Sequence, residues 1–519
     1  MSGFCVDGTS GVYTFSGACP DGTSVPSGCR IQYPYLLYFL SPPGACKQKT
    51  GLIYFCKFPG NNVGKQFFRY VREEKGLTKT TDLTTGTIWK RLLFFAIPLL
   101  LSSLVQQLYN TVDLIFVGNF IDKSASAAIG SSSLLVTCLV GFFGGMSVGS
   151  GVVVSHIFGA GETEKLSKAV HNAIALSIAG GLGSMFFGYF FAPVFLKLIN
   201  TPQDIYVNAV SYLRIYFFSL VFIFVYNLGS GVLRALGDSK SPLYAQAVGG
   251  LVNIAMDYLF IRCFENGVTG AAWATFCSQG TAALLTVYSL MKLDPAYSLH
   301  LRKIGFDREI LKKVILIGVP AGAQSLVITL SNVMAQYHIN SFGEDAIAAY
   351  TAYFKIELII YLPIVAFGQA IMAFAGQNMG ARNYKRMREG TRICLFMSMG
   401  LAFATSLLAL QFGPQLFRIF NKEPSVIETG CRIIGISFPF YFVYCILQIL
   451  GDSLRGAGKV KEPMYIVLVN ICIIRTILLF LIVPVVQDIT GVAVTYPATW
   501  ILTSVCMLVY YVKYQKSLA

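Results

Sequence analysis

Three acidic residues lie within long apolar stretches of the sequence: Asp113, Asp257 and Glu357. A charge inside a bilayer costs about 2.5–3.5 kcal/mol on the insertion scale, so each of them needs a reason. Asp113 follows Tyr109 by four positions and Asp257 follows Asn253 by four, which places each pair on one helical face. Carboxylates with amide and phenol oxygens suit a hard monovalent cation or a shared proton. The alternative is that each acid only bonds a neighbouring helix.

The other charges within apolar stretches are Arg214, Lys355 and Arg475. Lys355 and Glu357 are two positions apart, so they point to different sides of a helix. Either could touch a bound molecule, but a structural bond between helices is the simpler interpretation. The four histidines lack metal-ligand spacing, so we expect no metal site beyond a Na+ ion at the acids. The sequence has no P-loop and no catalytic constellation, so no cofactor and no enzyme activity are expected.

The composition predicts that these charges are held by membrane-spanning helices. Of the 519 residues, 55% are hydrophobic and 13% are charged, against about 25% charged in soluble domains. The charges form short clusters between apolar runs long enough to cross a bilayer. The net charge of +15 is spread over alternate loops, not gathered in one patch, which argues against nucleic-acid binding.

We expect twelve transmembrane helices in an all-α polytopic membrane protein. They are predicted near 90–118, 126–157, 167–190, 205–235, 241–262, 268–291, 311–341, 345–377, 387–413, 426–453, 462–485 and 490–513. Lys and Arg concentrate before the first span, in every second loop and after the last span. The intervening loops hold few: Lys123, Lys197, Arg262, Arg418 and Lys422. Both termini should therefore be cytoplasmic.

The two halves of the sequence repeat. The segment from Leu233 to Tyr244 aligns with 454–465, 221 positions later, and Gly159 meets Gly380 at the same offset. Pro98 meets Pro320 at an offset of 222. We therefore expect two six-helix bundles, 81–291 and 311–519, joined by a cytoplasmic linker at 292–310. A pseudo-two-fold axis along the membrane normal should relate them, as in rocking transporters.

Residues 1–80 differ from the rest, being rich in Gly, Pro, Ser and Cys. Their five cysteines could form a small disulfide or metal module, but no CxxC pair is present. We expect a disordered or artefactual extension instead. A second local pattern, the glycines at 141, 145 and 149, predicts close helix packing.

From about Asp82 to the C-terminus the sequence resembles the multidrug and toxic compound extrusion (MATE) family. The stretch 82–90, Pro98 and Gln106-Gln-Leu-Tyr-Asn-Thr-Val-Asp113 are similar to the family's first helix. Gly376-Gln-Asn-Met-Gly-Ala-Arg382 is similar to the exit of its eighth span. In the first-half counterpart, His156 stands where relatives commonly have Gln. The branch with DNA-damage-inducible and archaeal-type members is the most similar.

The resemblance implies roles for individual residues. It assigns cation coupling to four of them: Asp113, Asn253, Asp257 and Thr275. Polar partners of that site, or substrate contacts, would be Tyr109, Tyr212 and Asn227. Pro98 would let the first helix bend when Asp113 changes protonation. The second-half acids used by another branch are missing from span 7.

The function implied is a secondary active antiporter that works by alternating access. It would export amphipathic, often cationic drugs or metabolites in exchange for H+ or Na+, as a monomer in the cell (plasma or inner) membrane. A flippase for lipid-linked saccharides, from the same superfamily, is the alternative. Such a flippase would need a strongly basic central cavity. The sequence leaves the substrate and the choice between H+ and Na+ open.

Overall fold

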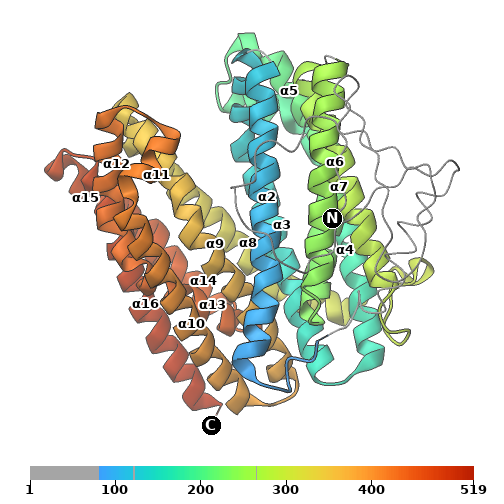
Figure 1. The fold of residues 1–519 in the computed structure, drawn as a ribbon. Coiled ribbons are helices and arrows are strands. Elements are labelled where there is room, and N and C mark those ends of the chain that lie inside the picture. The colour runs from blue at the N-terminus through green and yellow to red at the C-terminus, as the bar shows by residue number, and fades with distance from the viewer. Residues whose placement is uncertain (1–80, 121–122, 265, 519) are drawn as a thin grey trace, which may run out of the picture. The chain divides into compact units, whose positions relative to one another are not determined.

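The computed structural model describes residues 81–120, 123–264 and 266–518, and the expected N-terminal extension lies outside them. Throughout the described residues the regular structure is helical. The first half holds α2 (Ile88–Phe120), α3 (Lys123–Gly159), α4 (Thr163–Leu198), α5 (Gln203–Ala235), α6 (Lys240–Asp257) and α7 (Gly267–Met291). Helix α6 runs directly into a π-helical segment, η1 (Tyr258–Cys263). Figure 1 shows α2 and α6 near the middle of the molecule.

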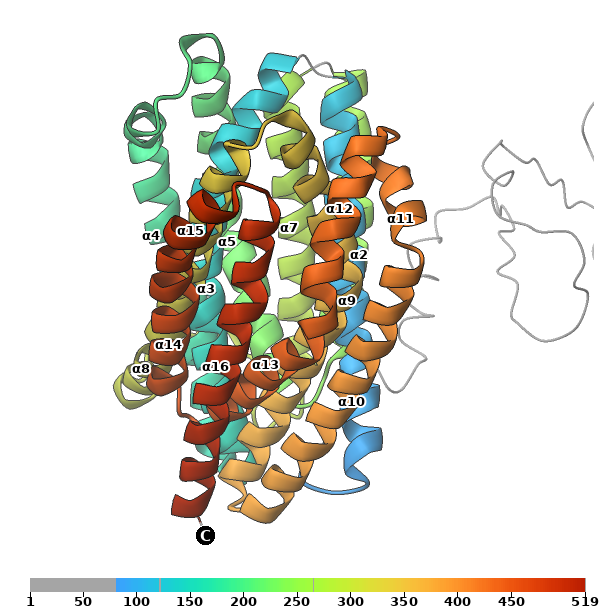
Figure 2. The ribbon, with the colours of Figure 1, turned by 90° about the vertical axis from the view of Figure 1, so that its left-hand side faces the viewer.

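The second half holds α8 (Arg308–Asn340), α9 (Glu344–Gly380), α10 (Tyr384–Gln411), α12 (Pro424–Ser437) with α13 (Tyr441–Gly456), α14 (Lys461–Val467) with α15 (Arg475–Val486), and α16 (Thr490–Ser517). A 3-10 turn, η3 (Phe438–Phe440), joins α12 to α13, and a π-helix, η4 (Leu468–Ile474), joins α14 to α15. A short helix, α11 (Gly413–Phe420), follows α10. Figure 2 shows α10, α12, α13 and α16 gathered in one bundle.

These segments confirm the predicted fold of twelve helices in two six-helix bundles. Within the described residues, ten helical segments are long and apolar enough to cross a membrane by length and composition. The two remaining segments are α6 with η1, and α7. Both are less apolar because they carry polar side chains, among them Asn253, Asp257 and Thr275. The two least hydrophobic spans thus hold three of the candidate site residues, while the others lie on α2 and α5.

The outer faces of the helices are apolar, as a lipid environment requires. Large side chains such as Phe94, Phe190 and Val485 are 67%, 68% and 82% exposed. A soluble protein rarely exposes so much contiguous apolar surface. A helix bonds its backbone polar groups within its own segment, which is the condition for spanning a bilayer.

The two halves meet through equivalent pairs of helices, α3 with α8 and α2 with α9. Glycines allow the α3–α8 contact. A Cβ atom on Gly145 would lie 2.0 Å from the backbone nitrogen of Gly322, and one on Gly149 would lie 2.8 Å from Gly318. At Gly141 a Cβ would make only an ordinary contact. The predicted close packing is confirmed at positions 145 and 149.

One end of the bundle pair is sealed by hydrogen bonds between the halves. The Gln377 side chain accepts from the backbone N–H of Leu83 at 2.9 Å and donates to the carbonyl of Ala235 at 2.8 Å. On the same end, His156 Nε2 lies 2.7 Å from the carbonyl oxygen of Gly456. Gln377 belongs to the motif at 376–382, so this motif joins α9 to the end of α5 and to Leu83, which precedes α2. The charge distribution predicts that this end is cytoplasmic.

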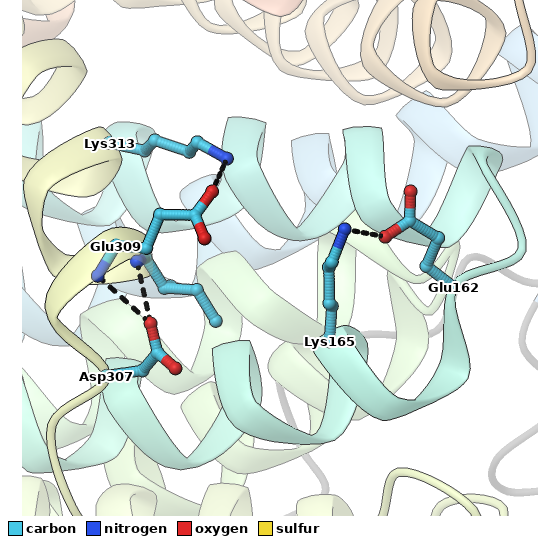
Figure 3. Close-up of polar contacts among 6 residues, drawn as sticks. Glu162, Lys165, Asp307, Glu309 and Lys313 are labelled. Carbon is cyan, nitrogen blue, oxygen red and sulfur yellow. Dashed lines mark hydrogen bonds and ion pairs between the residues drawn. The ribbon is translucent and has the colours of Figure 1, made fainter.

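The segment between α7 and α8 is fixed to the first half. The backbone N–H of His300 donates to His171 of α4 at 3.0 Å, and Asn172 donates to the carbonyl of Asp307 at 3.1 Å. The Asp307 carboxylate caps α8 by accepting from Glu309 N–H at 3.0 Å. Figure 3 shows this cap beside two exposed ion pairs, Lys165–Glu162 at 2.6 Å and Lys313–Glu309 at 2.7 Å.

Candidate functional site

The two acids of the first half are brought together by helix packing. Helix α2 packs against α6, so Asp113 and Asp257 become electrostatic neighbours although 144 positions separate them. Asp257 has no exposed surface and Asn253 is 2% exposed. Asp257 is also the last residue of α6, where the helix changes to the π-helix η1. Such π segments often mark functional sites because they redirect the side chains around them.

Several oxygens at this place are buried without a hydrogen-bond partner in the described residues. They are Asp113 Oδ1, both carboxylate oxygens of Asp257, and Asn253 Oδ1. A buried polar atom without a partner costs about 1–3 kcal/mol, so a folded protein rarely keeps several together without a use for them. Carboxylate and amide oxygens fit a proton or a small hard cation, and both would satisfy them.

Tyrosines surround the acids. Tyr212 and Tyr216 of α5 have stacked rings 5.9 Å apart, and both are electrostatic neighbours of Asp113. Tyr109 of α2 accepts a hydrogen bond from Gln246 of α6 at 3.1 Å. The structure thus places Tyr212 beside Asp113 and Asp257, and Tyr109 one helical turn before Asp113 on α2. It adds Tyr216 beside Asp113 and Gln246 as the partner of Tyr109, neither of which was predicted from the sequence. Tyr216 could have been predicted from its spacing, because it follows Tyr212 by one helical turn and so lies on the same helix face.

Two other predicted residues bond elsewhere. The side chain of Asn227 donates to the Ile223 carbonyl at 2.9 Å, and the Thr275 hydroxyl donates to the Ala271 carbonyl at 3.0 Å. In the described residues no hydrogen bond joins either side chain to the acids. Pro98 is buried within α2, where its neighbour Leu99 packs against α9, and α2 continues through it as one helix.

Two buried charged groups of the second half, Glu357 and Arg475, have side-chain hydrogen-bond partners. The Tyr441 hydroxyl of α13 donates to Glu357 of α9, as the interpretation of a bond between helices predicts. Arg475 is 3% exposed and donates to the Thr499 hydroxyl at 3.2 and 3.1 Å. Its guanidinium carbon lies 4.4 Å from the ring centre of Tyr496. Lys355 points away from these groups and is exposed.

A cavity of about 280 Å³ lies between the halves, near the sealed end. Helices α2, α3, α5 and α9 supply most of its wall. The wall includes Asn227, whose backbone carbonyl accepts from the Ser147 hydroxyl at 2.6 Å. Asn227 therefore belongs to this cavity and not to the acid cluster. In the part of the chain that the structure describes, no three His, Cys, Asp or Glu side chains group as metal ligands would.

Comparison with known proteins finds matches over most of the helical region. A sequence model of the MatE family matches twice, at residues 98–259 and 320–481, one match in each half. A probable multidrug resistance protein of Bacillus subtilis, YpnP, is 29% identical over 399 residues, which are 76% of this chain and 89% of YpnP. The multidrug export protein MepA of Staphylococcus aureus is 22% identical over 72% of this chain and 82% of its own length.

A solved structure shows the same fold. It is the outward-facing conformation of a multidrug resistance MATE family transporter of the MOP superfamily. The TM-score is 0.80 at 21% sequence identity, and the alignment covers 85% of this chain and 99% of that one. At this identity the similarity establishes the fold alone.

Proposed function

Because this chain belongs to the MatE family of multi-pass membrane transporters, we propose that it is a secondary active antiporter. It exports amphipathic, often cationic drugs or metabolites in exchange for H+ or Na+. The observation that carries this proposal is a pair of carboxylates, the half-buried Asp113 and the fully buried Asp257, whose buried oxygens lack partners in the described residues. The names of relatives such as YpnP and MepA support the substrate class.

In this proposal the coupling ion binds at the acid cluster of α2 and α6. Asp113, Asn253 and Asp257 supply oxygens to the proton or Na+, and Thr275 completes the set from α7. Tyr109 and Tyr212 hold the acids in place, while Asn227 contacts substrate from the cavity wall. A change in the charge of Asp113 biases α2 between bent and straight states at Pro98, where a proline removes one backbone hydrogen bond.

Alternating access is supported by the sealed end. Gln377 holds the N-terminal segment and α5 against α9, and these bonds would have to break for the cavity to open there. A transported molecule and the coupling ion must favour different states, because a ligand that binds both states equally shifts nothing. Helix α2 carries Asp113 and also lines the cavity, so one helix can couple the acid cluster to the cavity.

The proposed location is the cell membrane, as a monomer with both termini in the cytoplasm. Cysteine-accessibility labelling in intact cells tests this orientation. Positions in 378–392 and in the linker 292–310 should react only after permeabilisation, while 342–345 and 486–489 should react from outside. Labelling of the linker from outside would reverse the orientation.

The transport proposal itself is tested in everted membrane vesicles. An imposed pH gradient and an imposed Na+ gradient are applied separately while a fluorescent cationic drug is followed. Export driven by one gradient and not by the other identifies the coupling ion. If neither gradient drives drug movement although the protein is present and folded, the antiport proposal is wrong.

A further inference from the structure

The cavity between the halves has an unusual electrostatic character. Its wall combines apolar side chains, such as Val152 and Met372, with hydroxyl and amide groups, such as Ser102 and Gln106. Among the described residues that line it, Arg234 is the only charged one. The cavity is therefore a space of mixed polar and apolar lining with a single positive charge.

Arg234 has few partners in the protein. Its Nη1 donates to the Gln369 side chain at 3.3 Å, and the Tyr226 hydroxyl is an electrostatic neighbour. Within the described chain no carboxylate forms an ion pair with it. A buried charge without a counter-ion is costly, and a planar guanidinium fork matches a carboxylate in both charge and shape.

The second half shows what the same position looks like when it is neutralised. Arg455, 221 positions after Arg234, forms an ion pair with Asp452, one helical turn earlier on α13. Both side chains are largely buried, at 18% and 6% exposure. In the first half the residue that corresponds to Asp452 is Gly231. The second half thus carries its own counter-ion, and the first half does not.

The residues that face Asp452 and Gly231 from the neighbouring helices, α9 and α3, differ in a matching way. A Cβ on Gly368 would lie 2.1 Å from the carboxylate of Asp452, so α9 leaves room for the acid. The first-half counterpart of Gly368 is Ser147, and a Cβ on Gly231 would lie 2.5 Å from the Ser147 hydroxyl. In the second half, Asp452 faces Gly368. At the equivalent positions of the first half, Gly231 faces Ser147, so Arg234 has no acid beside it at the cavity.

We propose that this cavity binds the carboxylate of a transported amphipathic acid, with Arg234 as the counter-ion. The apolar residues of α3 and α9 hold the ligand's hydrocarbon part, and Gln369 fixes the guanidinium. This inference deepens the proposed export function and rests on it for its physiological meaning. Its new content is the residue: Arg234 is assigned as the group that holds the carboxylate of an acid or a zwitterion in this cavity.

The test is a binding measurement on the full chain, purified in detergent and without any gradient. The probes are 2-naphthoate and its neutral analogue 2-naphthamide, which have nearly the same shape. Isothermal titration calorimetry should show naphthoate binding about tenfold tighter than naphthamide, the scale of one additional charge-assisted hydrogen bond. Equal affinities for the two probes, or no binding of either, would overturn the proposal.

Two variants locate the preference. Arg234→Gln removes the charge but can still bond Gln369, and it should abolish the preference for naphthoate without changing naphthamide affinity. The double variant Ser147→Gly with Gly231→Asp builds the second-half arrangement and should have the same effect, because the new acid neutralises Arg234. It also serves as the second line of evidence if Arg234→Gln fails to fold. A preference that survives in folded protein of either variant contradicts the proposal.

The matched control is Arg432→Gln, which removes an exposed arginine that pairs with Asp488 at 3.2 Å and does not line the cavity. It should keep the tenfold preference. The measurement is independent of transport. Loss of gradient-driven efflux with the preference intact would refute the export function alone, while efflux without the preference would refute the carboxylate site alone.

Discussion

The two halves of this chain share one helical plan but treat their buried charges differently. In the second half, Glu357 accepts a hydrogen bond from Tyr441, and Asp452 is paired with Arg455. In the first half, oxygens of Asp113 and Asp257 have no hydrogen-bond partner in the described residues.

We interpret this difference as one between charges that stabilise the fold and charges that take part in the proposed coupling. A charge with fixed partners rigidifies the helices that carry it, because moving them would break several bonds at once. Acids without fixed partners can gain or lose a proton or a cation at little structural cost. The repeat thus supplies two bundles of one helical plan, and in the proposed mechanism the positions that differ give the first half the capacity to switch.

The largest expected effect comes from removing titration in the first half. Asp113→Asn keeps the side chain's size and most of its hydrogen bonding, but it cannot bind a proton or neutralise a cation. Gradient-driven drug efflux in vesicles should fall to background with normal expression. Asp257→Asn should do the same, and the double variant should be no worse than either single one.

The control for these variants lies in the other half. Glu357→Gln keeps an acceptor for the Tyr441 hydroxyl and should cost much less efflux. If Asp113→Asn exports drug at the wild-type rate, the first-half acids are structural and the comparison between the halves loses its meaning. If Glu357→Gln is as damaging as Asp113→Asn, both halves take part in coupling.

Replacing the two equivalent arginines of the repeat, Arg234 and Arg455, should destabilise the protein to different degrees. Arg455→Gln leaves the buried Asp452 without its counter-ion and should destabilise the protein by about 3–5 kcal/mol. Arg234→Gln removes a charge that has no counter-ion and should cost no more than about 1 kcal/mol. Denaturant unfolding in mixed micelles measures both. Similar losses for the two variants would mean that Arg234 has a partner of equal weight.

The glycine contact between the halves is expected to matter less, and only at some positions. Gly145→Ala forces α3 away from the backbone of Gly322 and should cost about 1–3 kcal/mol. Gly141→Ala on the same helix face makes only a 3.5 Å contact with Ser325 and should change stability little. The same unfolding measurement compares them. Equal effects would show that helix propensity and not the contact sets the cost.

The smallest effect concerns the loops that follow Arg234 and Arg455. Asp238 accepts hydrogen bonds at 3.0 Å from the backbone N–H groups of Lys240 and Ser241, where α6 begins. Asp238→Ala should therefore cost about 1 kcal/mol, as the loss of a helix cap does. Its second-half counterpart is Lys459, which is exposed, and Lys459→Ala should have no measurable effect. A loss in the second variant would point to a role for this loop beyond capping.

Much of the fold followed from the sequence because membrane insertion depends on local properties. Hydrophobic length and loop charge predicted twelve spans, and most of the predicted ends fall within four residues of the helix ends. The C-terminal end of α4 continues eight residues further than predicted, to Leu198. The π-helices η1 and η4 were not predicted, since nothing in hydrophobic periodicity distinguishes one inserted residue in a helical turn.

Only part of the candidate site could be predicted from the sequence. An acidic residue within an apolar stretch can be recognised from the sequence alone. Asp113 and Asp257 could therefore be predicted from the free energy that a charge costs inside a bilayer. Asn227 is equally polar, but its helix places it on the cavity wall between the halves. Tyr216 and Gln246 were missed because a tyrosine or a glutamine in a span does not reveal which neighbour it will meet.

The sequence by itself determined which segments cross the membrane, which residues are too polar to be there without a reason, and that the chain is a repeat. Only the tertiary structure decided which of those residues share a place. The pairing of Asp452 with Arg455, and the absence of such an acid beside Arg234, depend on which small residue the facing helix presents. That contact joins residues more than 80 positions apart. Side-chain packing across helices fixes it, and local sequence does not record it.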